Sequence, residues 1–163
     1  MALRAWYAAF HGASFGFTME ESELPDLHEG ELLVKVSYTS LCRSDVNTYA
    51  GKRRENTPTI LGHESIGVIE RIAPGVNRDA RGVPLWIGQR ITWGIYASDP
   101  SDPMSLKGIP QKASDLFKYG HEVVSANRSF HGGLSEYIVL RRNTPVVALV
   151  DSLSDRSASL INC

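Results

Sequence analysis

Short segments of β-type sequence, separated by frequent glycine and proline, constrain the fold of this chain more than any other feature. Residues 33–39 (LVKVSYT) alternate in period two, with Val34, Val36 and Tyr38 on one face, which predicts a half-buried strand. Further segments rich in β-branched and aromatic residues predict strands at 65–72 and 135–140 and weaker strands at 90–93 and 145–150. Short strands joined by many turns favour a barrel-like antiparallel sheet.

Helical signals are brief. They occur at 44–49, after Pro110 and after Ser154, where the serine is a suitable N-cap. Residues 98–114 are polar and rich in proline without a clear period, which indicates an extruded lobe. We therefore predict one mainly β (α+β) domain, a partly open β-barrel with a few short helices.

Charge and hydropathy exclude several function classes. The chain of 163 residues has 17 basic and 18 acidic side chains and a net charge of -1, so we expect no nucleic-acid partner. No segment reaches the roughly 20 apolar residues of a membrane helix, and the apolar N-terminus is too short for a signal peptide. We expect no membrane partner and a cytoplasmic location. Only Cys42 and Cys163 carry thiols, and reduced thiols can hold a metal.

Two motifs stand about twenty residues apart, at 41–45 (LCRSD) and 62–67 (GHESIG). Taken alone, Cys42 and His63 indicate little, because an isolated cysteine is usually a small buried hydrophobe and an isolated histidine a satisfied polar residue. Together the two motifs resemble those of the zinc-containing medium-chain alcohol dehydrogenases. The similarity continues along the chain through 68–76 (VIERIAPGV), 132–137 (GGLSEY), 151–154 and 161–163.

A finer resemblance concerns residues 118–122 (KYGHE), with 108–112 (GIPQK) before them. These runs are similar to those of a subgroup proposed to act in phosphonate catabolism. The broader resemblance implies a GroES-like fold, a name that describes shape and implies no chaperone function. It also implies an oxidoreductase that converts an alcohol to an aldehyde or ketone by hydride transfer to NAD or NADP.

The resemblance implies a ligand set for one catalytic zinc ion. Cys42, His63 and Cys163 would be the three protein ligands, with Glu64 beside the metal as an occasional or outer ligand. This Cys₂His set is the one already known for alcohol dehydrogenase, and the spacing alone does not establish it. Two thiolates and an imidazole suit a borderline-soft cation and leave a fourth position open, as catalytic sites require.

Residues near Cys42 also acquire roles through the resemblance. Ser44 matches the hydroxyl that relays the alcohol proton, Asp45 matches the carboxylate that orients the zinc-bound histidine, and Arg43 matches a cofactor-binding position. Alternatively, Ser44 and Asp45 form only the cap of a short helix, a role compatible with the first. Asn47 stands where many members carry a relay histidine. Because an amide does not titrate near neutral pH, the relay would end in water or be absent.

The lobe departs from the family pattern. Many relatives bind a structural zinc there with the spacing C-x₂-C-x₂-C-x₇-C, whereas this chain has Asp99, Asp102, Ser105 and Ala113 at those positions. Residues 98–114 would be the remnant of that lobe, with its zinc site lost. Because the length and register of the lobe are retained, we hypothesise that engineering replaced the four cysteines.

The chain contains no Gly-x-Gly-x-x-Gly motif after a predicted strand, so no dinucleotide site is visible. We therefore expect residues 1–163 to be a truncated catalytic domain that lacks its Rossmann domain, is inactive alone, and uses NAD or NADP only within a complete protein. A second interpretation is an isolated, engineered GroES-like scaffold or metal-binding domain without enzymatic activity. A zinc-free quinone-reductase-like relative fits less well, because such proteins generally lack both motifs. The alcohol and the oligomeric state stay open.

Overall fold

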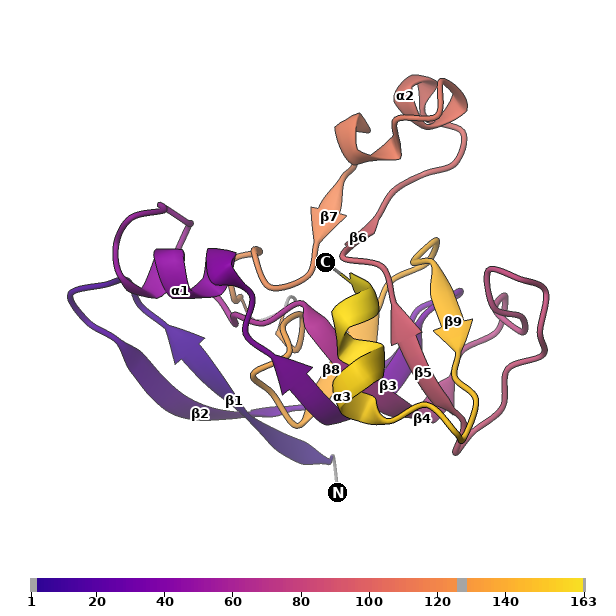
Figure 1. The fold of residues 1–163 in the computed structure, drawn as a ribbon, viewed down its shortest axis with the longest axis horizontal. Helices are drawn as coiled ribbons and strands as arrows, with labels where there is room; N and C mark the ends of the chain where they lie inside the picture. Colours follow the sequence, from indigo (N-terminus) through magenta and orange to yellow (C-terminus); the bar gives the residue numbers. More distant parts are fainter. Residues whose placement is uncertain (1–2, 126–128, 163) are drawn as a thin grey trace.

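A five-stranded antiparallel sheet lies at the centre of the computed structural model, which describes residues 3–125 and 129–162 (Figure 1). The strand order is β8-β3-β4-β5-β9. The strands are β3 (Leu32–Ser40), β4 (Glu64–Ile72), β5 (Arg90–Trp93), β8 (Tyr137–Leu140) and β9 (Val146–Ala148). All five correspond to segments with predicted β character, and the mainly β fold with few short helices is confirmed.

A separate hairpin of β1 (Arg4–Phe10) and β2 (Phe17–Glu23) packs beside this sheet. Isolated bridges from Tyr7 to Ser135 and from Phe10 to Thr59 attach it to the body. The sequence interpretation missed both strands, although the alternation of exposed and buried residues along β1 is clear in the structure. The hairpin covers one side of the domain and completes its second core.

Two apolar clusters form the core, and β3 contributes to both. Leu32 and Val34 pack with Ile69, Ile91 and other residues of the central sheet, whereas Leu33 packs with buried residues of β1. The first three residues of β3 are therefore buried on both faces, so the prediction of a half-buried strand was wrong there. The reason lies in the tertiary structure. The N-terminal hairpin covers the face of β3 that carries Leu33, which the alternation pattern predicted to be exposed to solvent.

The helices are short, and none in the described part of the chain has the length and apolar character to cross a membrane. They are α1 (Arg43–Tyr49), α2 (Pro103–Leu106), α3 (Asp155–Ser159) and the 3₁₀ turns η1 (Pro110–Lys112) and η2 (Leu160–Asn162). Ser154 caps α3 as predicted, because its side chain accepts a hydrogen bond from the Ser157 backbone.

The lobe projects from the body between β6 (Tyr96–Ala97) and β7 (Phe117–Lys118), with α2 at its tip (Figure 1). Carboxylates cross-link it. Asp102 accepts hydrogen bonds from the Met104 backbone at 2.7 Å and from the Ser114 hydroxyl at 2.7 Å. Asp115 accepts the backbone N–H of Asp99 at 2.8 Å. Hydrogen bonds therefore hold the lobe together without thiol ligands.

Candidate metal centre

The two sequence motifs meet where β3 ends and β4 begins. These strands are antiparallel and pair Ser40 with Glu64, so the residues that follow β3 lie beside those that precede β4. Cys42 follows Ser40 by two positions at the N-cap of α1, and His63 immediately precedes Glu64. The sheet register thus brings side chains more than twenty residues apart in sequence into one site.

Cys42, His63 and Glu64 offer one ligand atom each, and these three atoms lie within 4.8 Å of one another. His63 and Glu64 are buried, and Cys42 is partly buried. Ligand atoms in a tetrahedral zinc shell lie roughly 3.5 Å apart, so small side-chain adjustments would close this group around an ion. The thiol and imidazole suit zinc. The donor set therefore fits the predicted metal.

Asp45 lies behind these ligands, in the first turn of α1, and is only 3% exposed. Its carboxylate accepts the backbone N–H of Cys42 at 2.9 Å and that of Gly62 at 3.2 Å. The same carboxylate lies 3.6 Å from Nδ1 of His63. With Nδ1 turned toward Asp45, Nε2 is the nitrogen left for a metal. Asp45 therefore takes part in capping α1, whose N-cap residue is Cys42 and not Ser44, and its place beside His63 is compatible with the orienting role, which stays a prediction.

The electrostatics of the pair follow from burial and proximity. Burial by itself raises the pKa of Asp45. The nearby His63 and the hydrogen bonds from the backbone N–H groups of Gly62 and Cys42 have the opposite and larger effect, so this pKa lies below its ordinary value. Burial lowers the pKa of His63, but Asp45 and Cys42 outweigh burial and raise that pKa above its ordinary value. The site therefore stabilises a carboxylate beside the imidazole.

The carboxylate of Glu64 is held by a hydrogen bond from β3. The Ser40 hydroxyl donates to the Glu64 carboxylate at 2.6 Å and lies 3.3 Å from the Ser159 hydroxyl of α3. Segment η2, which follows α3, packs against β4. The chain therefore returns toward the site near its C-terminal end, although Cys163 lies outside the described residues and its predicted role stays a prediction.

The remaining predicted residues lie on α1. Ser44 is partly buried in the first turn beside Cys42, Arg43 is exposed, and Asn47 is partly buried one turn later. Their position next to Cys42 is compatible with the roles that the resemblance implies, which stay predictions.

His121 is a residue of this site that the sequence interpretation did not assign. Its ring stacks on that of His63, with centroids 5.2 Å apart and an interplanar angle of 29°. Its Nδ1 lies 3.0 Å from the Glu55 carboxylate, which pairs with Arg53 at 2.8 Å. Burial lowers the pKa of His121 despite the opposing effect of Glu55. The only sequence signal was the run at 118–122.

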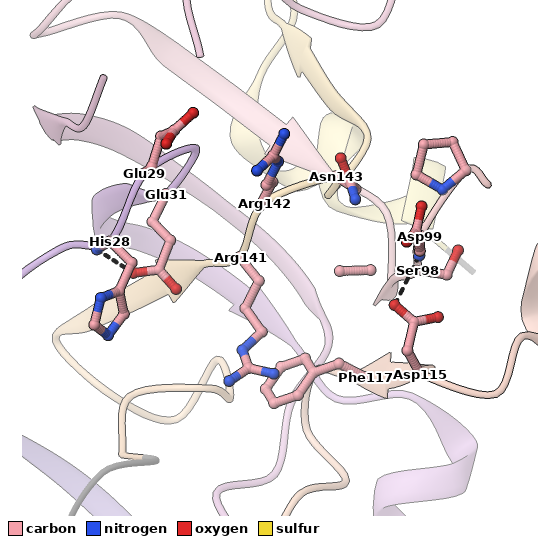
Figure 2. Close-up of a pocket in the computed structure, with 12 residues that line it drawn as sticks. His28, Glu29, Glu31, Ser98, Asp99, Asp115, Phe117, Arg141, Arg142 and Asn143 are labelled. Carbon is pink, nitrogen blue, oxygen red and sulfur yellow. Dashed lines mark hydrogen bonds between the residues drawn. The ribbon is translucent and has the colours of Figure 1, made fainter. Parts of the chain in front are cut away.

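A polar cleft of about 490 Å³ lies elsewhere, between the lobe and the loops beside β8 (Figure 2). Figure 2 shows Arg141 reaching toward Phe117, and its guanidinium lies 4.3 Å from the centre of that ring. Both acidic and basic side chains line the cleft, among them Glu29, Arg142 and Asp115. None of the three candidate ligands lines this cleft, so it is separate from the group at the β3–β4 junction.

Comparison with known proteins agrees with the fold and the motifs. The alcohol dehydrogenase GroES-like domain family matches residues 28–151. This chain belongs to that family. An alcohol dehydrogenase from Geobacillus stearothermophilus is 30% identical over 149 residues, which cover 89% of this chain and 40% of that protein. This chain thus spans about 40% of the length of that relative.

Solved structures of this family's relatives have the same fold. An alcohol dehydrogenase from Thermotoga maritima superimposes with a TM-score of 0.84 at 24% identity, covering 99% of this chain and 45% of that one. A protein described as a short chain alcohol dehydrogenase, from E. coli CFT073 and solved with NADH, has a TM-score of 0.75 at 25% identity. That match covers 97% of this chain and 42% of the other.

Proposed function

We propose that residues 1–163 form the catalytic domain of a zinc- and NAD(P)-dependent alcohol dehydrogenase. The observation that carries the proposal is the convergence of Cys42, His63 and Glu64 at the β3–β4 junction, with Asp45 behind them. Family membership supports alcohol oxidation, and the NADH in the E. coli relative supports a nicotinamide cofactor. The activity would belong to the complete protein, because this chain corresponds to less than half of its relatives.

Cys42, His63 and Cys163 would hold the metal, with Glu64 beside it. When bound, zinc supplies a Lewis acid that lowers the pKa of a coordinated hydroxyl. Asp45 would hold the His63 ring with Nε2 toward the ion. Ser44 would take up the proton released by the alcohol, and the exposed Arg43 would contact the cofactor phosphates. Asn47 cannot accept that proton, so the relay would end in water or be absent.

The substrate class is a small alcohol. Residues 108–112 and 118–122 support a narrower assignment to the subgroup proposed for phosphonate catabolism, and His121 within the second run contacts the metal-ligand histidine. Assays should therefore include alcohols that carry a phosphonate group beside simple primary and secondary alcohols.

The test is zinc per chain, measured by elemental analysis, for this protein and for its Cys42→Ser and Cys163→Ser variants. We expect about one zinc in the original protein, from its single predicted ligand set, and a large loss in both variants. Turnover with NAD and NADP is assayed in parallel, on this chain and on a full-length relative that carries the same residues. A chain that binds no zinc would contradict the proposal. Zinc without turnover in either protein would favour the scaffold interpretation.

A further inference from the structure

A metal-ligating histidine needs more than one restraint. Its ring orientation depends on two torsions, and a single contact at one ring nitrogen leaves the ring free to tilt about that contact. The carboxylate of Asp45 touches His63 at its Nδ1 edge, 3.6 Å away. A group that packs against the face of the imidazole would restrain the plane of the ring further.

His121 packs against that face. The two rings are close to parallel, at 29°, with centroids 5.2 Å apart. His121 is itself held, because its Nδ1 lies 3.0 Å from the Glu55 carboxylate and the Arg53 guanidinium lies 2.8 Å from the same carboxylate. The side chains of His121 and Glu55 are 9% and 13% exposed, so little solvent competes with their contact. A chain of three polar side chains therefore runs from the surface to the face of His63.

The backbone segments that carry His63 and His121 also lie close to each other. Gly62 and Gly120 precede the two histidines, and both have positive φ, at 90° and 78°. A Cβ atom at position 120 would lie 2.9 Å from the carbonyl oxygen of Gly62, closer than real contacts of this kind. The Gly120 backbone also donates to the carbonyl of His131 at 2.8 Å. The turns that carry the two histidines thus approach each other closely through their backbones, which leaves no room for a side chain at position 120.

We propose that His121, held by Glu55 and Arg53, is a positioning residue that fixes the ring plane of the metal ligand His63. The inference rests on the proposed metal centre and adds to it a residue that acts through His63. His121 is outside the group of candidate ligand atoms, and the contribution proposed for it is restraint of His63.

The test compares metal binding in His121→Ala, His121→Phe and Glu55→Ala with the unaltered protein. Zinc affinity is measured by competition with a chelating dye, and Co²⁺ is used to record the visible ligand-field spectrum. His121→Ala should weaken zinc binding by about 10–100-fold, as other losses of ligand-orienting partners do, and should alter the Co²⁺ spectrum. His121→Phe keeps a flat ring on His63 and should retain most of the affinity. The zinc affinity of Glu55→Ala should lie between those of His121→Ala and His121→Phe.

Controls separate positioning from general stability. The exposed His28 provides a matched variant, His28→Ala, which should bind zinc and Co²⁺ as the original protein does. Thermal unfolding of the metal-free and zinc-bound forms completes a thermodynamic cycle. A purely structural role would lower both stabilities equally and leave the affinity unchanged.

Two results overturn the inference alone: unchanged affinity and spectrum in His121→Ala, or equal losses in the Ala and Phe variants. Failure of the unaltered protein to bind zinc or Co²⁺ would instead overturn the metal centre, and this inference with it.

Discussion

The carboxylate of Asp45 lies 3.6 Å from Nδ1 of His63, with both side chains almost completely buried. Because Asp45 also accepts the backbone N–H groups of Cys42 and Gly62, one carboxylate ties together the two segments that carry the candidate metal ligands. This arrangement explains how the segments around Cys42 and His63, which are distant in sequence, are held next to each other. Its consequences can be measured.

Replacing Asp45 with asparagine should weaken zinc binding by about 10–100-fold, because the variant loses the charge that we propose orients His63. Competition with a chelating dye measures the change. Asp99→Asn is a matched control, since it removes a carboxylate of the same size from the exposed lobe. Equal zinc affinity in Asp45→Asn and the original protein would show that the Asp45 contact does not support the metal.

Glu64→Gln should retain about one zinc per chain, because the expected ligands are Cys42, His63 and Cys163. The affinity should fall, since the buried carboxylate stabilises nearby positive charge. Elemental analysis and dye competition give the two quantities. Loss of all bound zinc in this variant, with Cys163→Ser unaffected, would identify Glu64 as a direct ligand in place of Cys163.

Asp79→Asn should lower the free energy of unfolding by about 2 kcal/mol at neutral pH. The buried Asp79 carboxylate accepts backbone hydrogen bonds from Arg81, Val83 and Ala148 and joins the loop before β5 to β9. Burial raises its pKa, but the hydrogen bonds from Ala148, Val83 and Arg81 outweigh burial and lower that pKa from 3.8 to about 2. Urea unfolding of both proteins measures the difference.

The same pair of proteins tests the pH dependence. Since the pKa of Asp79 is lower in the folded state, its contribution is fully present above the unfolded value and is lost as pH falls toward the folded value of about 2. The stability difference between the original protein and Asp79→Asn should therefore shrink below about pH 4. A difference that stays constant down to pH 2 would exclude ionisation as its origin.

Tyr119→Phe should destabilise the domain by about 1–3 kcal/mol, because it leaves a partly buried backbone donor without its acceptor. The Tyr119 hydroxyl accepts the Arg141 backbone N–H at 2.7 Å and bonds the Thr144 hydroxyl at 2.6 Å. Thermal or urea unfolding provides the measurement, with Tyr38→Phe as a more exposed control. Zinc content should be unchanged, and equal stability of the two variants would contradict the prediction.

Asp102→Ala should loosen the lobe without affecting the metal centre. The variant removes the carboxylate that joins Met104 to Ser114. Hydrogen exchange should accelerate for amides in residues 99–115, while zinc per chain stays the same. Asp151→Ala, in an exposed turn outside the lobe, serves as the control. Unchanged exchange in the lobe would mean that other contacts hold it.

Local sequence patterns were sufficient for much of this fold. The β-branched segment at 90–93 coincides with β5, and the serine signal at 154 marks the cap of α3. Period-two alternation identified β3 because strand periodicity is a property of the backbone. The candidate ligands Cys42 and His63 were identifiable only through the motifs around them, since a single cysteine or histidine indicates little by itself.

The local patterns failed where burial depends on a distant partner. The N-terminal hairpin was missed, and with it the cover that buries Leu33. Nothing local to residues 53–55 or 118–122 indicates that Glu55 would hold His121 against His63. That contact requires Gly62 and Gly120 to meet, and their loops are separated by almost sixty residues.

By itself, therefore, the sequence determined the strand segments of the central sheet, the Ser154 cap of α3 and the identity of the motifs, because each depends on neighbouring residues along the chain. The tertiary structure decided which side chains share the candidate metal centre. It did so through the pairing of Ser40 with Glu64, the bridging carboxylate of Asp45 and the stack of His121 on His63. These relationships depend on strand register and loop packing, which arise only when distant segments are brought together on folding.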